Sequence, residues 1–131
     1  MSATGMKDHI GVIGKTELSD KETTLLTMLG RVIARAGKTL VTVPAKGTVA
    51  AVEMGNELEH GQLLHLEQGT INASAHTFIY ADERLMSRLR KVNPDLDQRD
   101  DIFLLSQPIE IELWLEAART VLTDKGIAFP E

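Results

Sequence analysis

Two short segments of the sequence each bring a lysine, a glycine and a threonine together. The first comprises Gly14, Lys15 and Thr16, and the second comprises Pro44, Ala45, Lys46, Gly47 and Thr48. A lysine ammonium, backbone N–H groups and a hydroxyl are groups that can hold a phosphate or another anion. Both segments follow short apolar runs, and we predict that both contact an anionic ligand.

Neither segment completes a longer nucleotide-binding motif. The first lacks the earlier glycine of the P-loop pattern G-x-x-x-x-G-K-[ST], and Gly11 with Gly14 falls short of the dinucleotide pattern G-x-G-x-x-G. A nucleoside triphosphatase and a dinucleotide-dependent enzyme are therefore not expected. What remains is a local anion site.

The second segment has the composition of a strand end followed by a helix start. Pro44 cannot continue a hydrogen-bonded strand, and Gly47 allows a ligand to approach the backbone closely. Thr48 is placed to cap the helix that follows, where the helix dipole is positive. We predict that Lys46 and the backbone N–H groups of Gly47 and Thr48 face an anion.

Other residue types point away from metal and thiol chemistry. The chain has no cysteine, and its four histidines lack the spacing of metal ligands. No serine lies in a G-x-S-x-G elbow, and the acidic run 95–101 lacks the glycine and the glutamate of a calcium-binding loop. We therefore expect neither a metal nor a cofactor.

Length and charge narrow the class of protein. The 131 residues are 43% hydrophobic and 25% charged, which is typical of one globular domain spanning residues 1–131. The chain has neither a long apolar segment nor a signal peptide, so we expect a cytoplasmic protein without a membrane partner. The formal net charge of -5 opposes broad attraction to nucleic acid.

Apolar runs alternate with amphipathic segments along the chain. Ser19 and Glu22 match a capping box at the start of the first amphipathic segment, and Gly37 marks its end. Further helices are predicted from Thr48 to about Gly61, over 83–91 and in the C-terminal segment. The predicted strands cover 9–14, 38–43, 63–68, 77–82 and 102–106.

This alternation predicts a Rossmann-like three-layer α/β/α domain with a parallel sheet of about five strands. Strands that are apolar on both faces need helices on both sides, reached by right-handed crossovers. Ligands of such sheets lie beyond the carboxyl ends of the strands, where the winding direction reverses. The residues expected in the interior are Val12, Leu40, Val41, Phe78, Ile79, Phe103 and Leu104.

Residues 10–66 resemble the first half of the SLOG superfamily. The resemblance lies in an apolar strand ending in glycine, the helix end "GRVIARAG", then "LVT" and the turn "VPAKGT" that opens a helix. This superfamily includes the DNA-processing recombination mediators and the Lonely Guy phosphoribohydrolases. In the mediators the turn carries a Leu-Ala-Arg-Gly-Ile-Asp pattern, and Lys46 stands where the arginine would be.

The resemblance to the recombination mediators implies a non-catalytic domain that binds a nucleotide or a nucleic-acid phosphate. Lys15, Lys46 and Arg99 would then contact single-stranded nucleic acid, weakly because of the negative net charge. The Lonely Guy family implies an alternative, a nucleotide N-glycosidase assisted by Glu53 or Glu17. That family's glutamate follows the threonine of the turn by three residues, whereas Glu53 follows Thr48 by five.

The C-terminal segment suggests self-association. Leu113, Trp114 and Leu115 are consecutive, so the predicted helix is apolar over more than one face. We therefore expect a two-fold homodimer. A purely dimeric assembly module is the third functional alternative.

Overall fold

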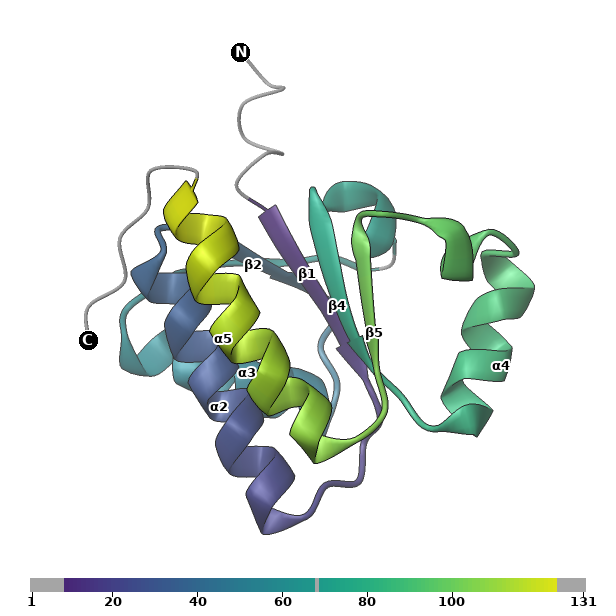
Figure 1. The fold of residues 1–131 in the computed structure, drawn as a ribbon, viewed down its shortest axis with the longest axis horizontal. Coiled ribbons are helices and arrows are strands. Elements are labelled where there is room, and N and C mark those ends of the chain that lie inside the picture. Colours follow the sequence, from purple (N-terminus) through teal and green to yellow (C-terminus); the bar gives the residue numbers. More distant parts are fainter. Residues whose placement is uncertain (1–8, 68, 125–131) are drawn as a thin grey trace.

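The computed structural model describes residues 9–67 and 69–124, which form a five-stranded parallel sheet with helices on both faces (Figure 1). The strand order is β3-β2-β1-β4-β5, and the predicted α/β fold is confirmed. The strands are β1 (His9–Gly14), β2 (Thr39–Thr42), β3 (Gln62–His65), β4 (His76–Tyr80) and β5 (Ile102–Leu105).

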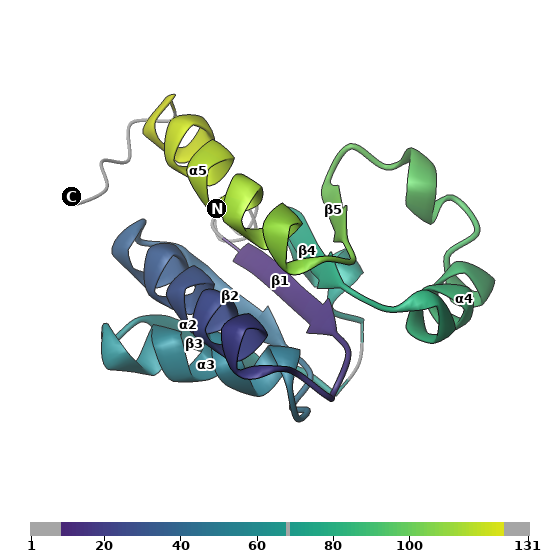
Figure 2. The ribbon, with the colours of Figure 1, turned by 60° about the horizontal axis from the view of Figure 1, so that its bottom comes forward.

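The two faces of the sheet are covered unequally. Helices α2 (Asp20–Arg35), α3 (Thr48–Leu58) and α5 (Pro108–Asp124) cover one face, and α4 (Glu83–Val92) lies on the other (Figures 1 and 2). Two short 3-10 helices, η1 (Ile71–Ala73) and η2 (Leu96–Gln98), complete the second face. The crossover from β3 to β4 therefore uses η1 and loops in place of a full helix.

Helix α2 begins and ends at the residues that the sequence indicated. The Ser19 N–H donates to Glu22 Oε1 at 2.8 Å, and the Glu22 N–H donates to Ser19 Oγ at 3.1 Å, which completes the capping box. Gly37 follows the helix with a φ of +75°, a conformation that favours glycine. Helix α3 ends at Leu58, slightly before the predicted end near Gly61.

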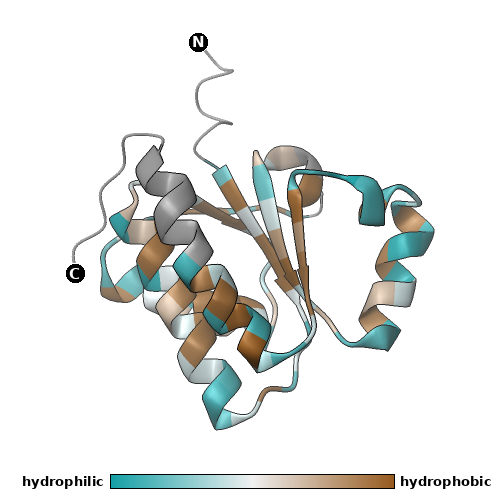
Figure 3. Cartoon of the chain, in the orientation of Figure 1, coloured by the Kyte–Doolittle hydropathy of each residue, from teal (hydrophilic) through white to brown (hydrophobic). Residues whose placement is uncertain are grey.

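The larger part of the core lies between the sheet and the three-helix face. Apolar residues of α2, α3 and α5 pack together with residues of the strands, and Figure 3 shows hydrophobic stretches on these helices and on the strands. A smaller cluster lies under α4 and η2. The larger cluster contains Ile10, Val12, Leu26, Leu29, Ile33, Leu40, Ala51, Val52, Phe78, Tyr80 and Ile111, and the smaller one contains Ile71, Ile79, Ala81, Leu96 and Ile102.

Helices α2 and α3 cross with their backbones in contact. A Cβ atom added at Gly30 would overlap the carbonyl oxygen of Val52, and one added at Gly55 would overlap that of Thr27. The crossing therefore depends on two glycines that face the partner helix. It fixes the position of α3, and with it the turn that precedes this helix.

The predicted interior is mostly confirmed, and the exceptions lie at edges. Phe103 and Leu104 are only half-buried because β5 is an edge strand. Met28 and Met54, apolar residues within the amphipathic helices α2 and α3, are 47% and 60% exposed because they lie outside the α2–α3 crossing. At the other edge all four residues of β3 are exposed.

The Trp114 side chain packs against aromatic residues of the sheet inside the protein. Its ring makes edge contacts with Phe78 and Phe103 at centroid distances of 5.1 and 5.3 Å. Of the three consecutive apolar residues only Leu113 is exposed. The apolar surface that suggested a homodimer is therefore much smaller than the sequence indicated. Within the described residues, no helix is both long enough and apolar enough to cross a membrane.

Candidate functional site

The turns after β1 and β2 lie side by side at the carboxyl edge of the sheet. The backbone N–H and the hydroxyl of Thr48 both donate to the carbonyl oxygen of Lys15, at 3.0 and 2.9 Å. The strand order reverses at β1, since β2 lies on one side of it and β4 on the other. The two predicted turns are thus joined at the place where ligands of such sheets bind.

Gly47, and not Thr48, is the N-cap of α3. Gly47 has a φ of +70°, and a Cβ atom added there would overlap the backbone of Thr16. Both observations require glycine at this position. The predicted cap at Thr48 is wrong, because its hydroxyl bonds the Lys15 carbonyl instead of an N–H of its own helix. The Thr48 N–H does not face an anion as we predicted either, because it donates to the same carbonyl.

Replacing Thr48 by alanine should lower the free energy of unfolding by about 1 kcal/mol, because it removes a buried hydrogen bond between the two turns. Thermal melts of the parent and of Thr48→Ala, Thr48→Val and Thr48→Ser measure this loss. Valine keeps the volume and serine keeps the hydroxyl. A Thr48→Val protein as stable as the parent would show that packing, and not the hydrogen bond, joins the turns.

The N-terminus of α3 carries no negative side chain. Glu22, Asp82 and Glu110 accept backbone N–H groups where α2, α4 and α5 begin. Helix α3 has neither an acidic residue in its first turn nor a side-chain cap. Among the described α-helices, α3 alone therefore has no acidic side chain at its positive end, and the exposed Lys46 lies beside it.

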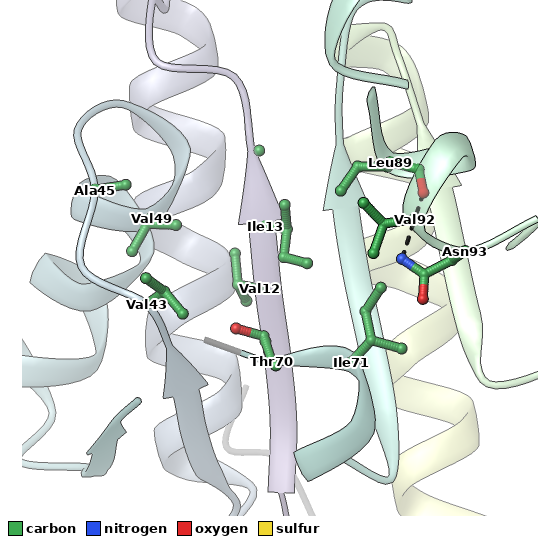
Figure 4. Close-up of a pocket in the computed structure, with 12 residues that line it drawn as sticks. Val12, Ile13, Val43, Ala45, Val49, Thr70, Ile71, Leu89, Val92 and Asn93 are labelled. Atoms are coloured by element: carbon green, nitrogen blue, oxygen red, sulfur yellow. Dashed lines mark hydrogen bonds between the residues drawn. The ribbon is translucent and has the colours of Figure 1, made fainter. Parts of the chain in front are cut away.

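A pocket of about 340 Å³ opens next to this helix end (Figure 4). Its walls are mainly apolar, and its volume is within the range of small-molecule sites. Residues of the β2–α3 turn face residues of α4 across the pocket, and β1 and η1 lie between them. The lining residues are Val12, Ile13, Gly14, Val43, Ala45, Val49, Gly69, Thr70, Ile71, Leu89, Val92 and Asn93.

Two polar side chains interrupt the apolar wall. Thr70 is only 4% exposed, and its hydroxyl points into the pocket toward the side of Val43 (Figure 4). Among the described residues, the structure shows no hydrogen-bond partner for this hydroxyl. Asn93, at the end of α4, donates through Nδ2 to the Leu89 carbonyl at 3.4 Å. A ligand in the pocket would find a hydrogen-bonding group at Thr70.

Lys15 lies on the other face of the sheet from the pocket. Its Nζ is 2.9 Å from Glu22 Oε2 and 5.0 Å from the ring centroid of Tyr80, whose hydroxyl also donates to Glu22. Tyr80 belongs to the larger core cluster on the α2 side. Lys15 therefore belongs to a network of interactions with Glu22 and Tyr80 within the protein. Of the first predicted segment, Gly14 lines the pocket, and the exposed Thr16 packs its backbone against Gly47.

The Glu22 carboxylate is ionised in this network. Burial alone would raise its pKa, but hydrogen bonds from the Ser19 N–H, the Tyr80 hydroxyl and Lys15 outweigh burial and lower the pKa to about 2. Burial and the neighbouring Glu22 raise the pKa of Tyr80, which keeps its hydroxyl protonated as a donor. The charge of Lys15 is thus matched inside the protein.

Arg99 does not join the other predicted site residues. It precedes β5 and pairs with Asp101 at 3.0 and 2.8 Å. Because all five strands are parallel, a residue before β5 and a residue after β2 lie at opposite edges of the sheet. Lys46 and Arg99 therefore cannot share one small ligand.

Glu53 also lies outside the pocket. Its carboxylate accepts a hydrogen bond from Thr42 Oγ1 at 2.6 Å and contacts His65 Nε2 at 3.0 Å. Glu53 belongs to α3, and its two partners are the last residues of β2 and β3. The pocket, in contrast, opens on the face of the sheet that α4 covers. The geometry does not fit the predicted N-glycosidase alternative.

Together these features define a Rossmann-like domain with a mainly apolar pocket at the switch point of its sheet. Two structures of the molybdenum cofactor carrier protein from Chlamydomonas reinhardtii are similar to this chain, with TM-scores of 0.61 and 0.59 and 18% identity. Each alignment covers 88% of this chain, and they cover 87% and 86% of the carrier chain.

A third similar structure is the molybdenum cofactor binding protein from the phototrophic bacterium Rippkaea orientalis. Its TM-score is 0.51 at 15% identity, and the alignment covers 86% of this chain and 96% of that one. No family model matches the chain, and no curated protein matches it. The similarities support the Rossmann-like fold.

These neighbours correct our functional prediction. They are molybdenum cofactor carrier and binding proteins, and neither recombination mediators nor phosphoribohydrolases are found among them. The predicted DNA-processing role, the nucleotide or single-stranded nucleic acid partner and the homodimeric assembly module are therefore wrong. The physical reason is that a glycine turn at a helix start specifies an anion but not the molecule that carries it.

Proposed function

We propose that this chain binds a small anionic cofactor of the molybdenum cofactor type in the pocket between α3 and α4. One observation carries the proposal: the positive end of α3, which has no side-chain cap, opens beside a mainly apolar pocket of about 340 Å³. The cofactor-binding names of the structural neighbours support it.

The lining residues fit such a molecule in three ways. The molybdenum cofactor joins a pterin ring system to a phosphate group. Apolar walls at Val43, Val49 and Val92 suit the ring, and the first turn of α3 with Lys46 suits the phosphate. The hydroxyl of Thr70 can bond a polar atom of the ring.

The described residues offer no set of side-chain ligands for the metal. Within the described residues no group of three His, Cys, Asp or Glu side chains could hold a metal ion, and the whole sequence lacks cysteine. The cofactor would be held through its organic part. When bound, it supplies the molybdenum chemistry, while this chain orients it and shields it from water.

Lys46→Ala should weaken cofactor binding by about 1.5 to 3 kcal/mol, the range for a hydrogen bond to a charged group. The fold should be unchanged because Lys46 is exposed. Calorimetric titration with molybdenum cofactor under anaerobic conditions measures the change. Lys21→Ala, on the distant surface of α2, is the matched control. Equal affinity of parent and Lys46→Ala would place the phosphate elsewhere.

A direct test is to purify the parent chain from cells that make the cofactor, and to measure molybdenum and pterin per chain. The proposal requires both in similar molar amounts. It also requires that Ala45→Trp, which places a bulky ring at the pocket wall, removes both. A parent chain that neither retains the cofactor nor binds it in titration would refute the function.

A further inference from the structure

The cations of this chain differ in how they are neutralised. Lys38 is buried and interacts with other residues. Ion-pair partners are present for Lys15, Lys21, Arg31, Arg35, Arg90 and Arg99. Among the cations whose side chains the structure describes, those without an ion-pair partner are Lys46, Arg84, Arg88 and Lys91. Three of these four lie on α4.

The three cations form a stripe along one face of α4. Arg84, Arg88 and Lys91 are spaced by four and three residues, so they are neighbours on the helix surface, and all three are exposed. We call them the basic stripe. The opposite face of α4 packs Leu85 and its apolar neighbours against the smaller core cluster. The stripe therefore faces away from the protein.

The basic stripe borders the mouth of the pocket. Val92 lies one turn after Arg88 on α4, lines the pocket and is 78% exposed. Figure 4 shows it on the α4 wall, across from the β2–α3 turn. An apolar side chain beside three cations gives this rim the composition of a protein-contact surface.

We infer that the basic stripe docks an acidic surface of a partner protein at the pocket mouth. Like charges three and four residues apart on a helix repel one another. Most of the other cations whose side chains are described have an ion-pair partner within the protein. A partner's carboxylates would relieve the repulsion and speed the encounter. The inference rests on the proposed function, since a partner seated there would receive or deliver the pocket's ligand.

The geometry favours a protein over a nucleic acid. The stripe runs from Arg84 to Lys91, a rise of roughly 10 Å along the helix. Nucleic-acid binding draws its affinity from contacts with many successive phosphates, and the net charge of -5 repels a long polyanion. A short row of carboxylates on a protein surface matches both the length and the local charge.

A defined acidic peptide tests the inference. A fluorescent 12-residue peptide of alternating Glu and Ala should bind the full chain at low salt and dissociate as salt is added. The variant Arg84→Gln/Arg88→Gln/Lys91→Gln should bind roughly tenfold more weakly or worse. Lys21→Gln/Arg31→Gln/Arg35→Gln changes the net charge equally on α2 and should bind like the parent.

Titration of the same proteins with molybdenum cofactor separates docking from ligand binding. The stripe variant should keep the parent's cofactor affinity, and Lys46→Ala should keep the parent's peptide affinity. Four outcomes overturn the inference: no peptide binding by the parent, equal binding by the stripe variant, tighter binding of oligothymidylate than of peptide, or loss of cofactor binding in the stripe variant. Failure of cofactor binding in the parent itself would instead refute the proposed function.

Discussion

Replacing Gly30 by alanine should lower the free energy of unfolding by about 3 kcal/mol or more. The new methyl group would overlap the Val52 carbonyl, which belongs to the backbone of α3 and cannot rotate away. The helices would have to separate along the contact that fixes α3, and overpacking against backbone is among the most destabilising single changes. Gly55→Ala should behave alike, because its methyl group would overlap the Thr27 carbonyl.

Urea denaturation of these variants measures the loss. The matched control is Gly37→Ala, where no atom lies within 4 Å of the added methyl group. Only the left-handed backbone, with its φ of +75°, opposes alanine there, and the expected loss is about 1 kcal/mol. If Gly30→Ala were as stable as Gly37→Ala, the close crossing of α2 and α3 would be wrong.

Glu22→Ala should lower the free energy of unfolding by about 3 to 5 kcal/mol, the loss expected when one partner of a buried ion pair is removed. The Glu22 side chain is 9% exposed, and its loss would leave Lys15 and the Tyr80 hydroxyl without their acceptor. It would also open the capping box with Ser19. Glu22→Gln keeps the length and a cap acceptor and should lose less.

The pH dependence of stability separates charge from packing in these variants. The pKa of Glu22 is about 2 in the folded chain and near 4.5 when unperturbed. Its stabilising contribution is therefore fully present above pH 4.5 and is lost as the pH falls toward 2. Denaturation at pH 7 and pH 3 should show a smaller acid loss for Glu22→Gln than for the parent. Parallel losses would mean that the fold does not lower the pKa of Glu22.

The fold follows from patterns that are local in the sequence. The alternation of apolar runs with amphipathic segments, the Ser19–Glu22 capping box and Gly37 are enough to indicate the strands, their parallel arrangement and the first helix. The exposure of Met28 and Met54 could not be predicted, because it depends on where α3 crosses α2. That crossing is set by Gly30 and Gly55, two residues whose contact no periodicity reveals.

Only one wall of the candidate site could be predicted from the sequence, for a similar reason. The β2–α3 turn carries its own signal in Pro44, Lys46 and Gly47. The facing wall comes from Thr70 and Val92, which lie in a loop-like segment and on an amphipathic helix and belong to no motif. Only the tertiary structure brings them opposite the turn, and the lysine that looked equivalent, Lys15, is turned to the other face.

The limited covering of the second sheet face, on which α4 lies, affects how the pocket would bind a ligand. Helix α4 has no fully buried residue, whereas α3 is held against α2 by backbone contact. We expect a ligand in the pocket to meet one wall fixed by backbone contact and one wall held only by partly buried side chains, and ordering that second wall would take part of the binding free energy. Affinity in this site is then a property of the rigidity of α4 as much as of the atoms that touch the ligand.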